Sequence, residues 1–257
     1  MVSNISSKST SVPVEQVSGI HKAGDQALPG KARVFITGTI VMGLVALGLG
    51  FQHLETPHWP QYLCYLVLSV LASALKVRLP GVNGTLSPNF LFILIGIADL
   101  SLPETLAMAC VATFIQCYWN SQRRPMPVQV AFNVAALVIS AAAAYQLPHI
   151  LLGLAQANSV VVLLALAAII FYLTNTLLVS TVLAFIGNQP IGTVWRKCHL
   201  WSFPYYGAGA AVAALMHVSN QVAGWPVSLL ILPLMYLVYA YYHEYTENAA
   251  GSLIPSE

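Results

Sequence analysis

Apolar runs long enough to cross a lipid bilayer follow one another along most of this sequence. A bilayer core of about 30 Å requires roughly 20 apolar residues in a helix. Windows of this kind lie near residues 33–51, 60–75, 87–102, 103–120, 127–146, 158–186, 201–218 and 225–243. We therefore expect an all-α, polytopic integral membrane protein, a helical bundle with about eight hydrophobic segments.

The composition excludes a water-soluble fold. Apolar residues make up 58% of the 257 residues and charged residues only 7%, whereas a soluble domain carries about 25% charged residues. Mean hydropathy is +0.74. The third window is the weakest, because sixteen residues span only about 24 Å as a helix. We expect it to be tilted, partly re-entrant or buried among its neighbours, so seven full spans plus one short one is an alternative count.

The basic residues predict the orientation of the bundle. All ten Lys and Arg fall on the cytoplasmic side if the N-terminus is cytoplasmic and the chain crosses eight times, as the positive-inside rule requires. The basic loops carry Lys76, Arg78, Arg123, Arg124, Arg196 and Lys197. We expect a disordered cytoplasmic tail over 1–32, the bundle over 33–245 and a short cytoplasmic tail over 246–257.

Polar side chains inside membrane segments are the first candidates for a ligand site. On the fourth segment, Gln116 and Asn120 belong to a polar face with Cys110, Thr113 and Cys117; on the fifth, Gln129, Asn133 and Ser140 share a face. The two faces can meet as ordinary interhelical hydrogen bonds worth about 1 kcal/mol or less each, or they can line a small-molecule pocket. Gln116, Asn120, Gln129 and Asn133 are therefore candidate ligand-binding residues.

Two carboxylates, Asp99 and Glu104, stand at the tip between the third and fourth segments and complete the candidate set. Glu104 follows Pro103 at an expected helix start, where free amides and the helix dipole favour a carboxylate. Capping and ligand binding explain it equally well. Asp99 lies near the end of a short apolar helix, where an ionisable side chain is costly unless it reaches water or a partner.

The sequence carries no signature of catalysis. It has no Gly-rich phosphate loop, no H-E-x-x-H and no G-x-S-x-G, which are the motifs that would indicate an enzyme. His149 and His217 fall on the same predicted outer side as Asp99 and Glu104, but no H-x-x-x-H pair is present. We expect no enzymatic activity, no metal site, no cofactor and no nucleic-acid partner.

One stretch carries a family resemblance. Residues 79–106 read LPGVNGTLSPNFLFILIGIADLSLPETL, followed by QCYW at 116–119, RRP at 123–125, PVQV at 127–130 and FNV at 132–134. This pattern resembles the multi-helix membrane input region of bacterial HD-GYP and GGDEF signalling proteins, over roughly residues 33–245. In that family a cytoplasmic output domain acting on cyclic di-GMP follows; this sequence stops at Glu257, so cyclic di-GMP turnover is not expected of it.

The resemblance implies a sensor in the bacterial inner membrane, a bundle that binds a small molecule or lipid and acts on a cytoplasmic signalling protein. The short third segment after an LPGxxGT loop resembles, more loosely, the substrate-binding membrane subunits of energy-coupling vitamin transporters. That alternative implies transporter subunits as partners. A third alternative, a non-catalytic assembly subunit of a membrane complex, predicts no ligand pocket.

Overall fold

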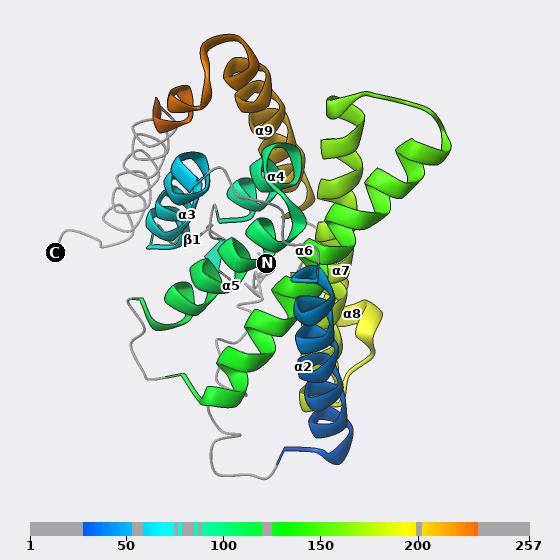
Figure 1. Ribbon diagram of the computed structural model, residues 1–257. Helices are drawn as coiled ribbons and strands as arrows, with labels where there is room; N and C mark the ends of the chain where they lie inside the picture. Colours follow the sequence, from blue (N-terminus) through cyan, green and yellow to red (C-terminus); the bar gives the residue numbers. More distant parts are fainter. Residues whose placement is uncertain are drawn as a thin grey trace, which may run out of the picture.

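The computed structural model describes residues 28–52, 59–74, 77–78, 85–86, 89–119, 125–198 and 202–230. These residues form a bundle of helices (Figure 1), apart from an antiparallel pairing of two short strands, β1 (Val77–Arg78) and β2 (Thr85–Leu86). The helices are α2 (Gly30–Gly50), α3 (Trp59–Ala74), α4 (Asn89–Asp99), α5 (Leu102–Tyr118), α6 (Pro127–Leu154), α7 (Val160–Gly187), α8 (Ile191–Cys198), α9 (Phe203–Ala223) and the 3-10 helix η2 (Trp225–Leu230). Of the tail expected over 1–32, residues 1–27 lie outside the described residues, whereas 30–32 already belong to α2. The tail expected over 246–257 lies outside the described residues.

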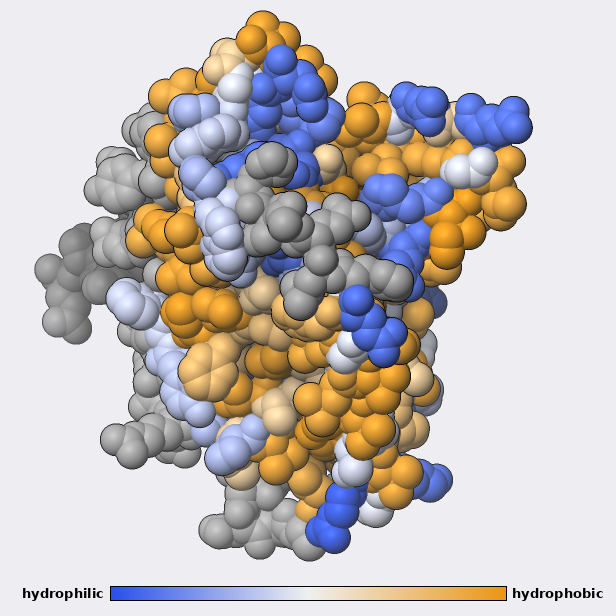
Figure 2. Space-filling model, viewed as in Figure 1, coloured by the Kyte–Doolittle hydropathy of each residue, from blue (hydrophilic) through white to orange (hydrophobic). Residues whose placement is uncertain are grey.

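Three helices of the described part, α2, α6 and α7, are long and apolar enough to cross a bilayer. The face drawn in Figure 2 is largely hydrophobic, and hydrophilic residues are most frequent in its upper part and reappear at its lower edge. The expected helical bundle is thus confirmed, with three helices that could cross a membrane by their length and composition. The expected number of eight segments is not established: α3 and α5 have 16 and 17 residues, and the window at 225–243 lies mostly outside the described residues.

The short helix α4 is the buried centre of the bundle. It has only 11 residues, which span about 16 Å, and every residue from Asn89 to Ile97 is buried. Helices α3, α5, α7 and α9 all contact it. Of the three arrangements expected for the third segment, burial among its neighbours is the one observed. Helix α4 is apolar on every side, and a helix of this kind is typically buried among other helices.

Small residues allow the closest helix contacts. A Cβ built on Gly43 of α2 would lie 2.6 Å from Cβ of Ala135 in α6, so these two backbones approach as closely as small residues permit. On α9 the decisive small residue is Gly209, where a Cβ would lie 2.1 Å from Cζ of Phe90. Gly207, on the small-residue face expected from the sequence, has no such neighbour within 4 Å.

The connection between α7 and α9 contains a helix that hydropathy did not predict. Helix α8 packs against α7, and the indole N–H of Trp195 donates to the hydroxyl of Thr176 at 3.0 Å. Arg196 is exposed on it. Of the other residues of the basic loops, Lys197 lies in α8 and Arg78 in β1, while Lys76, Arg123 and Arg124 lie outside the described residues.

Candidate functional site

The carboxylate of Asp99 is the centre of a buried polar cluster at one end of the bundle. Only 5% of its side chain is exposed, although it sits at the last residue of α4. Its neighbours come from the first turns of α3, the last turns of α9 and the following η2. We call this cluster the Asp99 network, and it consists of Gln61, Tyr65, Asp99, His217, Asn220 and Ser228.

Both oxygens of Asp99 accept hydrogen bonds. Oδ2 accepts from the Tyr65 hydroxyl and from the Asn220 amide, each at 2.9 Å. Oδ1 is paired with Nδ1 of His217. Three side chains from two other helices thus hold one carboxylate, which satisfies the condition that a charge buried in a membrane protein needs partners.

The remaining members tie these partners to one another. The Asn220 amide also donates to the Tyr65 hydroxyl at 2.7 Å. The Ser228 hydroxyl lies 2.9 Å from Oδ1 of Asn220 and 3.2 Å from the Tyr65 hydroxyl, and Gln61 donates to Tyr65 at 3.4 Å. This closed network links α3, α4, α9 and η2. Moving one of these helices away would leave a buried polar group without its partner, so the network stabilises their observed arrangement.

Of the two paired residues Asp99 and His217, His217 is the more exposed to solvent. Its side chain is 14% exposed, against 5% for Asp99. Its Nδ1 is taken by Asp99, and its Nε2 has no hydrogen-bond partner among the described residues. A molecule that arrives at this end would therefore meet the imidazole before the buried carboxylate.

Glu104, the second carboxylate expected at this tip, has the capping role rather than a place in the Asp99 network. Its Oε2 accepts from the backbone N–H of Ser101 at 2.8 Å and from the Ser101 hydroxyl at 2.6 Å. In this capping arrangement the side chain of the third helical residue accepts a hydrogen bond from the backbone N–H of the residue just before the helix. Oε1 is buried and has no hydrogen-bond partner among the described residues.

A second candidate site lies where α2 and α6 begin and α5 and α7 end. A cavity of about 390 Å³ is lined there by side chains of these four helices, including Cys117, Gln129 and Asn133. The Asn133 amide donates to the Cys117 sulfur at 3.7 Å. We call it the Asn133 cavity. The polar faces expected on the fourth and fifth segments therefore do meet, at this end.

The six candidate ligand-binding residues do not form one site. Asp99, the last residue of α4, and Glu104 lie beside the start of α5, whereas Gln129 and Asn133 lie near its other end. The 17 residues of α5 separate the two places by about 25 Å. Gln116 is partly buried but does not line the Asn133 cavity. Asn120 lies outside the described residues.

Sequence reasoning missed most of the Asp99 network. Tyr65, Asn220 and Ser228 were not among the candidates, and His217 was placed only on the same side as Asp99. A signal was present in the spacing, because Gln61 and Tyr65 are four apart, His217 and Asn220 are three apart, and residues at these spacings share a helix face.

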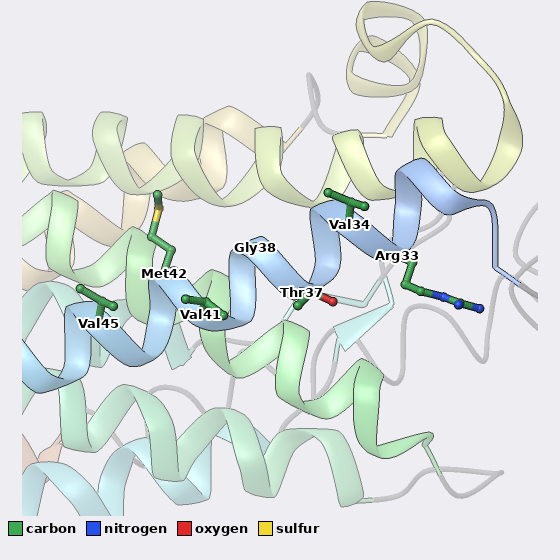
Figure 3. Close-up of a pocket in the computed structure, with 7 residues that line it drawn as sticks. All are labelled: Arg33, Val34, Thr37, Gly38, Val41, Met42 and Val45. Atoms are coloured by element: carbon green, nitrogen blue, oxygen red, sulfur yellow. The ribbon is translucent and has the colours of Figure 1, made fainter.

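A surface hollow on α2 (Figure 3) is lined by Arg33, Val34, Thr37, Gly38, Val41, Met42 and Val45. All seven belong to one helix, and most are apolar, as expected for a face that meets lipid.

Among the described residues no three His, Cys, Asp or Glu side chains are grouped as metal ligands. No protein-family model, curated protein or solved structure matches the chain.

Proposed function

We propose that this chain is a non-catalytic sensor of a bacterial inner membrane, a bundle that takes up a small molecule or lipid from the outer side and passes the change to a cytoplasmic protein. In the proposed orientation the start of α2, with Lys31 and Arg33, faces the cytoplasm together with Arg196, as the positive-inside rule favours. The Asp99 network then faces outward.

The observation that carries the proposal is the buried carboxylate of Asp99 with its imidazole partner. Folding of a membrane bundle does not need an ionisable pair, and such residues within membrane segments mark functional sites by default. Here the pair joins the ends of α4 and α9, and the His217 side chain, which is 14% exposed, is where an incoming molecule would act.

Aromatic contacts link the start of α4, nine residues before Asp99, to α8. Phe90 at the start of α4 lies 4.8 Å from Tyr206 of α9 between ring centroids. Tyr206 lies 5.1 Å from Tyr172 of α7, which lies 6.2 Å from Trp195 of α8. A shift of α4 or α9 caused at the Asp99 network would therefore be felt at α8, because packed interiors transmit displacement.

The bound molecule can be tested by purifying the protein directly from its membrane in polymer-bounded discs and identifying co-purifying small molecules by mass spectrometry. Asp99→Asn keeps the shape of the side chain but removes its charge. We expect wild type to enrich a molecule over the bulk membrane and Asp99→Asn to lose it. His149→Gln, a change at an exposed histidine outside the network, is the matched control and should retain it.

Coupling to a partner can be tested with a photo-crosslinking amino acid placed at the exposed position of Arg196. A sensor predicts a crosslinked cytoplasmic protein whose yield changes in Asp99→Asn. An assembly subunit predicts the same yield in both, with identical small-molecule profiles. If Asp99→Asn altered neither the profile nor the yield while the protein remained folded, the sensor proposal would be wrong.

A further inference from the structure

The Asn133 cavity has a lining suited to an uncharged molecule. Most of it is hydrocarbon, contributed by side chains such as Ile36 of α2, Phe132 of α6 and Val182 of α7. None of the described residues that line it is charged, so an ionised group placed inside would have no opposite charge to compensate for its lost hydration. The volume of about 390 Å³ falls within the range of small-molecule sites, roughly 300–1,000 Å³.

Two amide side chains supply the polar part of the lining. Gln129 and Asn133 are four residues apart on α6 and therefore share a face. Oε1 of Gln129 accepts from the backbone N–H of Met126 at 3.2 Å, and the Asn133 amide nitrogen donates to Cys117. The Gln129 amide nitrogen and the Asn133 carbonyl oxygen have no partner among the described residues, so one donor and one acceptor remain for a ligand.

From this lining we infer that the Asn133 cavity binds an uncharged amphiphile, an apolar molecule with a hydroxyl or carbonyl group as its polar head. The amides hold the head, and the hydrocarbon walls from α2 and α7 hold the tail. This site is separate from the Asp99 network and does not depend on the function proposed for it. Neutral glycerolipids and isoprenoid quinones share this chemistry, and the experiment below distinguishes them.

The position of the cavity fits entry from the membrane. Leu28 and Met126 line it next to the first turns of α2 and α6, and Arg33 lies at the same end of α2. In the orientation proposed above, the polar amides therefore lie near the cytoplasmic boundary of the bilayer. An amphiphile that enters sideways would keep its head at that boundary and its tail among the helices.

Cys117 provides a reporter inside the cavity. In a variant with Cys64, Cys110 and Cys198 changed to Ala, the protein in saturated phosphatidylcholine discs is treated with N-ethylmaleimide, and thermal unfolding is recorded in parallel. The probes are 1-monooleoylglycerol, a benzoquinone with a fully substituted ring and a short isoprenoid tail, dodecane and oleate. A probe that fills the site at about ten times its Kd should slow labelling about tenfold by mass action and raise the midpoint of thermal unfolding.

We expect protection by at least one of the two oxygen-bearing neutral probes, and not by dodecane or by ionised oleate. Protection by monooleoylglycerol alone identifies a glycerolipid site, and protection by the benzoquinone alone identifies a quinone site. Asn133→Leu should remove the difference between the protecting probe and dodecane.

Val179→Phe, which fills the cavity, should abolish protection and the thermal shift, whereas Val162→Phe, the same change elsewhere on α7, should not. The inference is overturned if dodecane protects as well as the neutral probes, if protection survives Val179→Phe, or if no probe alters either the labelling rate or the unfolding midpoint. His149→Gln, at an exposed position outside both sites, should leave the result unchanged. Because this experiment changes no member of the Asp99 network, its failure would not affect the test of that network.

Discussion

Asp99 illustrates how one residue can be shielded from lipid and still remain polar. Its carboxylate is nearly inaccessible, yet each of its oxygens has a donor. Buried charge is tolerated only with such partners, and removing one partner costs more than the bond itself contributes, because the group left behind has lost its hydration.

The Tyr65 hydroxyl should be energetically coupled to Asn220. Tyr65→Phe is expected to lower the free energy of unfolding by about 1–2 kcal/mol, and combination with Asn220→Leu should cost less than the sum of the two changes, because they share one hydrogen bond. A double-mutant cycle of unfolding free energies measures this. Tyr118→Phe, at a tyrosine that is 49% exposed, should change stability by less than about 0.5 kcal/mol, and simple additivity for Tyr65 and Asn220 would contradict the network.

Gly209 should tolerate no side chain. Gly209→Ala would place its Cβ 2.1 Å from Cζ of Phe90, so the buried Phe90 ring or the two helices must shift, at an expected cost of about 1–3 kcal/mol. Gly207→Ala is the matched control on the same helix, because a Cβ there meets nothing within 4 Å. Thermal unfolding should show a lower midpoint for Gly209→Ala and an unchanged or slightly higher one for Gly207→Ala; equal midpoints would show that the contact is not rigid.

At the scale of elements, α4 and α8 are held by different means. Helix α4 is enclosed by apolar contacts on all sides, so its place follows from burial. Helix α8 is short, carries exposed Arg196 and is fastened by the bond from Trp195 to Thr176. This polar contact therefore adds to the packing of α8, in which Val194 is buried and the Trp195 ring lies against Tyr172 of α7.

Loss of that contact should loosen α8 specifically. Thr176→Val preserves the shape of the side chain but removes the acceptor for Trp195, and a bond worth about 1 kcal/mol corresponds to about fivefold faster amide exchange where opening limits it. Hydrogen–deuterium exchange should show this increase over 191–196. Thr181→Val, whose hydroxyl bonds to Leu177 O in its own helix, should leave exchange in α8 unaltered; the same rate in both variants would refute the anchoring role.

At the scale of the whole molecule, the helices divide the protein into two ends with different chemistry. The starts of α2 and α6 and the end of α7 surround the Asn133 cavity, while the ends of α4 and α9 and the start of α3 form the Asp99 network. The turn between α6 and α7, at residues 155–159, follows the end of α6, whereas the cavity lies at the start of this 28-residue helix.

The proposed orientation makes this division testable. Reporter fusions after Gly30, within 146–157 and after Glu257 should read cytoplasmic, external and cytoplasmic, because positive residues remain on the side from which translocation starts. Reporters active on opposite sides of the membrane measure this. A fusion within 146–157 on the same side as Gly30 would require a different number of crossings before α6.

The sequence by itself determined the membrane class and the approximate course of α2, α6 and α7, because hydropathy along a helix is a local property that needs no partner. It also indicated the capping position of Glu104, since a carboxylate just after Pro103 at a helix start acts on its own first turn. The polar faces of the fourth and fifth segments showed only that these two helices could meet there; the contact of Asn133 with Cys117 comes from the structure.

Only the tertiary structure decided which residues surround Asp99. His217 lies 118 positions away in the sequence, and no local pattern states that α9 returns to the end of α4. The same holds for Gly209, whose role depends on the ring of Phe90, and for α8, whose position depends on Thr176. Contacts between distant segments depend on how whole helix faces pack against one another. A single sequence is compatible with several such pairings and does not show which one forms.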